Sequence, residues 1–262
     1  MGPSRLVEIL ASAGCVAPDE EAAELIRAAR DPDHLASMVE RRTRGEPLAW
    51  ITGEIVFAGN RVTIAPGVYV PRQQTELLVG VALGFLGHQG CAVDLCTGSG
   101  AVAVALAAAR PAARVLAVDV DPAAWACACA NGIDAHCGDL DAALPAGLTG
   151  AVDLVTAVPP YVPSDQLQYL PRDVLAYEPV GALDGGPAGT AVLERVVAAA
   201  ARLLRPGGHL VVEMGGDQHS ALAPVLARAG FSDMQAHHDE DGDLRVLSVR
   251  YGGSARRRSS RH

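Results

Sequence analysis

The sequence predicts an α/β fold in which a mostly parallel β-sheet carries helices on both faces, with a short helical unit in front of it. Apolar runs at 92–95, 115–118, 154–157 and 210–213 alternate with segments rich in Ala and Leu. Predominantly apolar strands separated by helices are typical of a parallel sheet buried on both faces. Half of the 262 residues are hydrophobic, so one domain and a small accessory unit can bury a substantial core.

Residues 1–45 are expected to form an N-terminal helical domain. The segment 19–29 opens with acidic side chains, which favour a helix N-terminus, and Asp31-Pro32 is an N-cap followed by proline at the first helical position. Gly45 is a suitable stop. Helices this short are stable only when they pack on one another or on a larger domain.

Residues 46–70 differ in character from the segment before them. Apolar and β-branched residues are separated there by turn formers at Gly53, Gly59-Asn60 and Pro66-Gly67. This pattern predicts a β-hairpin that links the helical domain to the main domain.

The main α/β domain is expected over residues 71–251, with a last strand at 245–251 that closes the sheet. Residues 252–262 form a basic tail, which we expect to be disordered rather than a nucleic-acid arm, because it is rich in Gly and Ser. The net charge of −9 also argues against a broad phosphate-binding surface, so nucleic acid is not expected as the direct substrate. The basic residues of the tail are Arg256, Arg257, Arg258 and Arg261.

Membrane insertion and metal binding are not expected. No run approaches 18 uninterrupted apolar residues, and the N-terminus lacks the long apolar core of a signal peptide, so we expect a cytoplasmic protein. Cys127-x-Cys129 has the wrong spacing for a zinc knuckle. The adjacent His237 and His238 would point to opposite faces of a strand, so they do not form a metal site.

A glycine-rich turn follows the strand at 92–95 and opens an Ala-rich helix at 101–110. Glycine lets the backbone approach a ligand closely, and a helix N-terminus offers unpaired N–H groups. A purely structural strand-to-helix turn would explain the same glycines. The candidate cofactor-binding residues of this turn are Asp94, Cys96, Thr97, Gly98, Ser99 and Gly100.

Carboxylates follow the next two predicted strands. Asp119 lies about 20 residues past the glycines, where its side chain can accept from both ribose hydroxyls of a nucleoside. Asp139 can accept from an adenine amino group while Leu140 packs on the ring, although a helix cap would explain Asp139 equally well. Ala103 occupies the third small position of a dinucleotide fingerprint, and no second phosphate site is apparent. The sequence therefore favours S-adenosylmethionine (SAM), which has no phosphate, over a dinucleotide.

The loop after the fourth strand contains Val158, Pro159, Pro160 and Tyr161. Prolines fix the backbone, and the tyrosine adds an aromatic face. A rigid carbonyl beside a flat ring, at the carboxyl end of a parallel sheet, is suited to hold a planar substrate nitrogen. A proline-rich surface loop is the structural alternative. We take these four residues as the catalytic candidates, with Val158 also a candidate on the cofactor side.

Together these features resemble the protein-(glutamine-N5) methyltransferases, the HemK group, which modify peptide-chain release factors or a ribosomal protein. The resemblance implies a seven-stranded Rossmann-like SAM-dependent methyltransferase domain behind a helical substrate-recognition domain. It implies methyl transfer to a glutamine side-chain amide of a release factor or a ribosomal protein. The segments that carry the resemblance are 44–47, 51–53, 70–78, 94–100, 119, 138–139, 159–161, 177–179, 182–186 and 241–246.

The chain departs from the family pattern at one position of the proline loop. The family has Asn-Pro-Pro-Tyr, and this chain has Val158 at the Asn position. In the mechanism that the resemblance implies, the glutamine NH₂ donates to that Asn and to the following Pro carbonyl, but Val158 cannot accept a hydrogen bond. The favoured interpretation is amide methylation that uses the Pro159 carbonyl and a substitute acceptor. The alternatives are methylation of another amino group, as on nucleic-acid bases, and SAM binding without catalysis.

Overall fold

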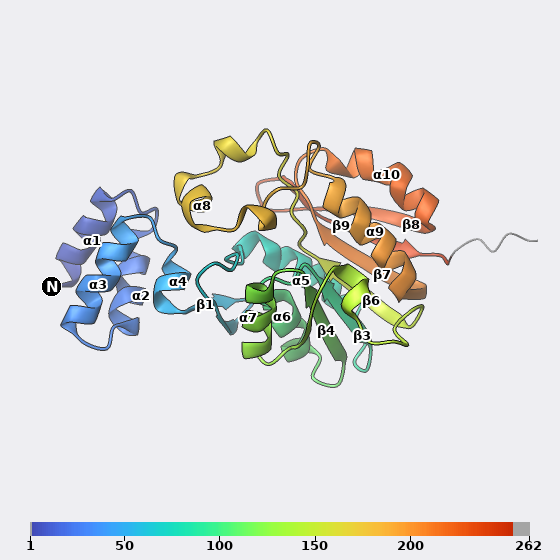
Figure 1. Ribbon diagram of the computed structural model, residues 1–262, viewed down its shortest axis with the longest axis horizontal. Coiled ribbons are helices and arrows are strands. Elements are labelled where there is room, and N and C mark those ends of the chain that lie inside the picture. The colour runs from blue at the N-terminus through green and yellow to red at the C-terminus, as the bar shows by residue number, and fades with distance from the viewer. Residues whose placement is uncertain (1, 254–262) are drawn as a thin grey trace, which may run out of the picture.

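The computed structural model describes residues 2–253, with only the backbone described at 172 and 173; most of the predicted basic tail lies outside these residues. Helices α1 (Pro3–Ser12), α2 (Pro18–Ala28) and α3 (Pro32–Thr43) pack together at one end of the molecule (Figure 1). The expected N-cap of α3 is present, because an Asp31 carboxylate oxygen accepts from the His34 N–H at 2.7 Å. The buried residues of this helical core are Leu6, Leu10, Ala22, Leu25, Met38, Val39 and Ile51.

The linker contains the expected hairpin, formed by β1 (Glu54–Phe57) and β2 (Asn60–Thr63), but it begins with a short helix, α4 (Leu48–Thr52). Neighbouring helical side chains diverge, so Trp50 and Ile51 enter two different cores: Ile51 packs in the N-terminal helical core and Trp50 in the core of the main domain. The periodicity of a short apolar run does not distinguish a helix from a strand. The sequence therefore did not predict α4.

A sheet of seven strands forms the main domain, in the order β5-β4-β3-β6-β7-β9-β8, and confirms the predicted α/β architecture. All neighbouring pairs are parallel except those of β9, which is antiparallel to β7 and β8. The strand order reverses between β3 and β6, and ligands of open α/β sheets bind at the carboxyl ends beside such a reversal. The strands are β3 (Cys91–Leu95), β4 (Arg114–Asp119), β5 (Asp134–Cys137), β6 (Val152–Ala157), β7 (Leu204–Glu213), β8 (Phe231–His238) and β9 (Leu244–Tyr251).

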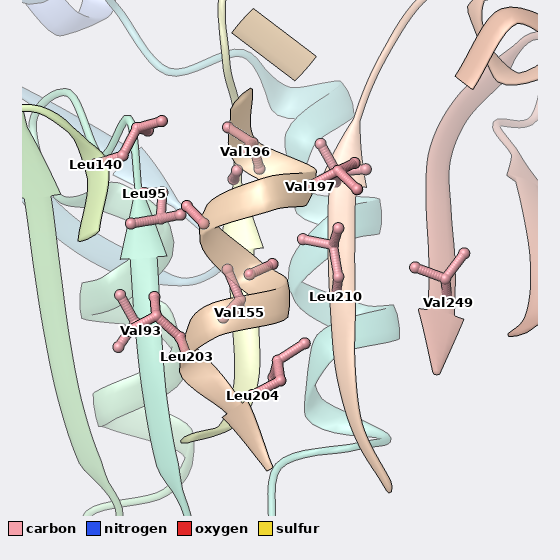
Figure 2. Packing of buried hydrophobic residues seen from close by; sticks show 14 of the residues in the cluster. Val93, Leu95, Leu140, Val155, Val196, Val197, Leu203, Leu204, Leu210 and Val249 are labelled. Atoms are coloured by element: carbon pink, nitrogen blue, oxygen red, sulfur yellow. The ribbon is translucent and has the colours of Figure 1, made fainter. Parts of the chain in front are cut away.

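Helices cover both faces of this sheet, because successive side chains of its strands point to opposite sides. Ala92 and Leu154 pack in the cluster that contains residues of α5 (Glu76–Leu83) and α6 (Ala101–Ala109). Val93 and Val155 pack on the other side, against α9 (Ala191–Leu203), as Figure 2 shows. Helix α10 (Gln218–Ala229) joins α9 on that side, and α7 (Pro122–Ala130) contacts β4 and β5.

A long connection between β6 and α9 lies between the N-terminal helices and the sheet (Figure 1). Its Tyr177 hydroxyl donates to the Arg44 carbonyl at 3.2 Å, and the Tyr177 ring meets Trp50 edge to face. This connection therefore contacts the N-terminal helices, the linker and the main domain. The short helices are α8 (Arg172–Tyr177) and the 3₁₀ turns η1 (Gln73–Thr75), η2 (Leu140–Ala143), η3 (Leu167–Tyr169) and η4 (Val180–Ala182).

Candidate active site

The loop between β3 and α6 turns sharply at the carboxyl edge of the sheet. Cys96, Gly98 and Gly100 adopt left-handed backbone angles, with φ of 55°, 56° and 83°. A β-carbon at Gly100 would lie 3.1 Å from the side chain of Ala128 on α7, a tight contact, and the left-handed φ also favours glycine there. Cys96 holds a conformation that costs a non-glycine residue about 1–3 kcal/mol, and strain of this kind is concentrated at functional sites.

Asp94 anchors this loop from inside the protein. It is 1 % exposed, and its carboxylate accepts from the Thr97 hydroxyl at 2.5 Å and the Thr156 hydroxyl at 2.6 Å. Burial raises the pKa of Asp94 to about 6, although these hydrogen bonds oppose the shift. Asp94, Thr97, Ser99 and Gly100 do not line the cavity described below.

The raised pKa of Asp94 predicts a pH-dependent stability difference between the protein and an Asp94→Asn variant. Above pH 6 the buried Asp94 carboxyl of the folded protein is charged, whereas near pH 4 it is protonated and neutral. The contribution of Asp94 to stability therefore falls as pH rises from about 4 to about 6. We expect the free energy of unfolding of the variant, relative to wild type, to rise by about 2–3 kcal/mol between pH 4 and pH 7 in urea titrations. A difference that stays constant with pH would contradict this explanation.

A cavity of about 320 Å³ opens beside the loop, at the carboxyl ends of the central strands, and we call it the cofactor cavity. Its wall is mostly apolar, as in sites for small organic ligands. The structure brings seven of the predicted residues together on this wall: Cys96, Gly98, Asp119, Asp139, Leu140, Val158 and Pro160. Lining residues that sequence reasoning did not select include Tyr69, Val120, Ala182 and Arg195.

Asp119 ends β4 at the floor of the cofactor cavity. One of its carboxylate oxygens accepts from the Gly98 N–H at 2.8 Å, and the other accepts from the Asp121 N–H at 3.0 Å. Each oxygen has a further lone pair, so the carboxylate can accept additional hydrogen bonds from a ligand. Burial raises the pKa of Asp119, whereas the two backbone N–H groups lower it.

Asp139 and Leu140 form another wall of the cofactor cavity. Leu140 is buried with a left-handed φ of 50°, and the Asp139 carboxylate is paired with Arg195 of α9 at 2.6 Å. Arg195 is 56 positions away in sequence, and no local pattern marked it as a partner. The guanidinium and the carboxylate therefore belong to one ion pair at the rim of the cavity.

The proline loop is held by residues of the β7–α10 junction. The Tyr161 hydroxyl donates to the Glu213 carboxylate at 3.0 Å, and the Gln218 side-chain amide donates to the Tyr161 carbonyl at 2.6 Å. Glu213 is completely buried, and burial raises its pKa. Burial together with the Glu213 carboxylate also raises the pKa of Tyr161, so its hydroxyl keeps its proton. A charged residue at the end of an apolar strand was the sequence signal that could have identified Glu213.

A second cavity, of about 620 Å³, lies on the other side of this loop, and we call it the acceptor cavity. Pro159 and Tyr161 line it, together with Arg72, Gln73 and Gln74 of the domain junction. The residues that line both cavities are Tyr69, Val158 and Ala182. The two cavities therefore meet at the start of the proline loop, which is the arrangement needed to bring two ligands into contact.

Arg72 and Glu178 form an ion pair and also line cavities. The Arg72 guanidinium donates to both oxygens of Glu178, at 2.7 and 2.8 Å, and lies 4.8 Å from the centre of the Tyr69 ring. Arg72 lines the acceptor cavity, and both residues line a further cavity next to α4. The ion pair ties the domain junction to the connection that carries α8.

Metal and membrane features are absent from the part of the chain that the structure describes. Across residues 2–253, no group of three or more His, Cys, Asp or Glu side chains is placed to hold a metal ion. In the same range, no helix is long and apolar enough to span a membrane.

Solved structures with the same architecture define the class of this fold. The ribosomal protein L11 methylase of Lactobacillus delbrueckii subsp. bulgaricus has a TM-score of 0.51 at 18 % identity, with 72 % of this chain and 84 % of that chain covered. The 16S rRNA N2 G1207 methyltransferase of T. thermophilus, solved with AdoMet and guanosine, has a TM-score of 0.52 at 22 % identity, with 76 % and 44 % covered. At this identity the likeness shows the fold, which is that of the SAM-dependent methyltransferases.

Relatives at higher identity define the family. No protein-family model matches the chain. The release factor glutamine methyltransferase of Mycolicibacterium smegmatis is 39 % identical over 229 residues, with 84 % of this chain and 81 % of that protein covered. The enzyme of the same name from Streptomyces coelicolor is 35 % identical over 264 residues, with 92 % and 94 % covered. The chain belongs to the family of release factor glutamine methyltransferases, and SAM is the methyl donor of its class.

Proposed function

We propose that the protein methylates a glutamine side-chain amide nitrogen of a peptide-chain release factor, with SAM as the methyl donor. The observation that carries this proposal is the contact between the cofactor cavity and the acceptor cavity at Val158, beside the Pro159–Tyr161 loop. Relatives that share more than a third of their residues with this chain over most of its length carry the name of that reaction.

The residues of the cofactor cavity are chemically suited to SAM. An added β-carbon at Gly98 would have nothing within 4 Å, so the backbone there is open to a ligand. Arg195, which lines this cavity, is paired with Asp139, so the cavity favours a ligand without phosphate. In this proposal Asp119 accepts from the ribose hydroxyls, Asp139 faces the adenine amino group, and Leu140 covers the ring.

The residues of the proline loop would hold the amide. When bound, SAM supplies a methyl group on a positively charged sulfonium centre. An amide nitrogen is a weak nucleophile because its lone pair is delocalised. The protein therefore has to orient this nitrogen and stabilise the positive charge that develops on it. In this proposal the Pro159 carbonyl accepts from the amide N–H, and the Tyr161 ring, fixed by Glu213 and Gln218, covers the amide plane.

The N-terminal helices are the part of the chain that we propose to recognise the protein substrate. This proposal keeps the predicted division into a helical domain (1–45), a hairpin linker (46–70) and a methyltransferase domain (71–251). It is supported by the further cavity next to α4, which Glu24 and Arg42 line together with Arg72 and Glu178. Arg72 also lines the acceptor cavity, so a peptide that enters beside the helices would reach the proline loop.

Incubation of the purified protein with radiolabelled SAM and the release factors of its host tests the function. We expect label on a release factor, at a glutamine side chain identified by mass spectrometry. The matched control is a release factor in which that glutamine is replaced by glutamate. Label on a ribosomal protein instead would move the substrate assignment to that protein. Label on nucleic acid, or none despite SAM binding, would contradict the proposal.

A further inference from the structure

The wall shared by the two cavities has a single polar side chain. Of its three residues, Val158 and Ala182 are apolar, and Tyr69 carries a hydroxyl. The reacting nitrogen belongs to the ligand of the acceptor cavity and has to meet the methyl group of the ligand in the cofactor cavity. It must therefore lie beside this shared wall. The other polar side chains of the acceptor cavity do not line the cofactor cavity; they are Arg72, Gln73, Gln74 and Tyr161.

A primary amide brings two N–H donors into this site. A donor that loses water without gaining an acceptor costs free energy, so an amide-methylating site needs acceptors for the nitrogen that also orient it. The Pro159 carbonyl can take one N–H, and the Val158 side chain can take none. A second acceptor must therefore come from elsewhere on the shared wall.

We propose that the Tyr69 hydroxyl oxygen is this second acceptor, and that it orients the substrate amide in place of a polar side chain at position 158. The inference rests on the proposed function, because it assigns a residue to the amide that is methylated. Tyr69 is half-buried, and the Arg72 guanidinium at 4.8 Å from its ring centre is itself fixed by Glu178. The ring therefore has a defined position, as preorganised catalysis requires.

The chemistry of this hydroxyl suits the role. Burial raises the pKa of Tyr69 to about 12, although the Arg72 cation and its hydrogen bond to Tyr69 oppose the shift, so the phenol is neutral at physiological pH. A phenol oxygen that accepts from Arg72 keeps a second lone pair for a further donor. A neutral phenol oxygen accepts hydrogen bonds without removing a proton. This is sufficient for an amide that must be held and not deprotonated before it reacts.

Replacement of Tyr69 by phenylalanine tests the inference, because it removes only the hydroxyl and keeps the ring under Arg72. With the release factor as substrate, we expect kcat to fall by about 10- to 100-fold, as for the loss of one oriented hydrogen bond. SAM affinity, measured by calorimetry, should stay unchanged and shows that the variant is folded. The matched control is Tyr177→Phe, whose hydroxyl bonds to the Arg44 carbonyl and which lines neither cavity; it should keep the wild-type kcat.

A second variant provides a rescue that a merely structural role would not show. Adding Val158→Asn to Tyr69→Phe restores an acceptor on the shared wall, and most of the lost kcat should return. Wild-type kcat in Tyr69→Phe, or loss of its SAM binding, would overturn the assignment of Tyr69 and leave the proposed function standing. A wild-type protein that binds SAM and leaves the release-factor glutamine unmodified would overturn the proposed function, and the Tyr69 inference with it.

Discussion

Replacement of Asp119 by alanine is expected to weaken SAM binding by about 10²-fold or more, as measured by calorimetry. Hydrogen bonds from a ligand to a carboxylate contribute about 1.5–3 kcal/mol, and two ribose hydroxyls are proposed to donate to this one. The variant also loses the acceptor for the Gly98 N–H at 2.8 Å, which helps to hold the β3–α6 loop against the cavity. Both losses act on the same ligand, so the effect on affinity should exceed that of any other single side chain of the cofactor cavity.

Asp119→Asn is the matched control for this result. The amide keeps one oxygen acceptor and the shape of the side chain, so its affinity should lie between those of wild type and Asp119→Ala. Unfolding midpoints of the three proteins would show whether the fold is retained. Unchanged affinity in a folded Asp119→Ala variant would mean that the ribose lies elsewhere in the cavity.

Replacement of Gly185 by alanine is expected to lower kcat by about 10²-fold or more, with a much smaller loss of SAM affinity. Its β-carbon would lie 2.7 Å from the Gly189 carbonyl oxygen, and 2.8 Å from both the Pro160 carbonyl oxygen and the Tyr161 Cα. All three are backbone atoms, which cannot rotate away as a flexible side chain could, so the proline loop must shift. A displacement of about 1 Å at a reacting centre can cost 10²-fold in rate.

Gly87→Ala separates this effect from the general consequences of replacing a glycine. A β-carbon at Gly87 has nothing within 4 Å, and this loop lies outside the two cavities. Both variants are to be compared in methylation kinetics, SAM calorimetry and thermal unfolding. Wild-type kcat in Gly185→Ala would show that the proline loop tolerates displacement. It would contradict the view that catalysis needs the rigid packing of this loop.

The Gly185 contact also explains a segment that sequence reasoning could only match to a family pattern. Residues 184–186 carry part of the resemblance, but the pattern gave no physical reason for the glycines. In the structure Val162 and Asp184 form a parallel β-bridge, and the Gly185 N–H donates to the Val162 carbonyl at 2.8 Å. The segment therefore runs directly along the proline loop, where a side chain would prevent the approach.

The sequence alone determined the parts of this protein that depend on near neighbours in the chain. Apolar runs identified the core strands of the sheet, and the spacing of Gly98 and Asp119 placed a turn and a carboxylate at the same sheet edge. The Asp31 cap was also predictable, because its partner is three residues away. Helix α4 was not predictable, because its short apolar run suits a strand equally well.

Tertiary structure decided which polar side chains face a ligand and which face the protein. Asp94 and Asp119 look alike in sequence, each at the end of an apolar strand, yet Asp94 is buried on two threonine hydroxyls and Asp119 lines the cofactor cavity. The partners of the site come from distant segments: Arg195 is 56 residues from Asp139, and Glu178 is 106 residues from Arg72. Local propensity and periodicity carry no information on contacts between residues so far apart in sequence. These contacts form only when the sheet brings its loops to one edge.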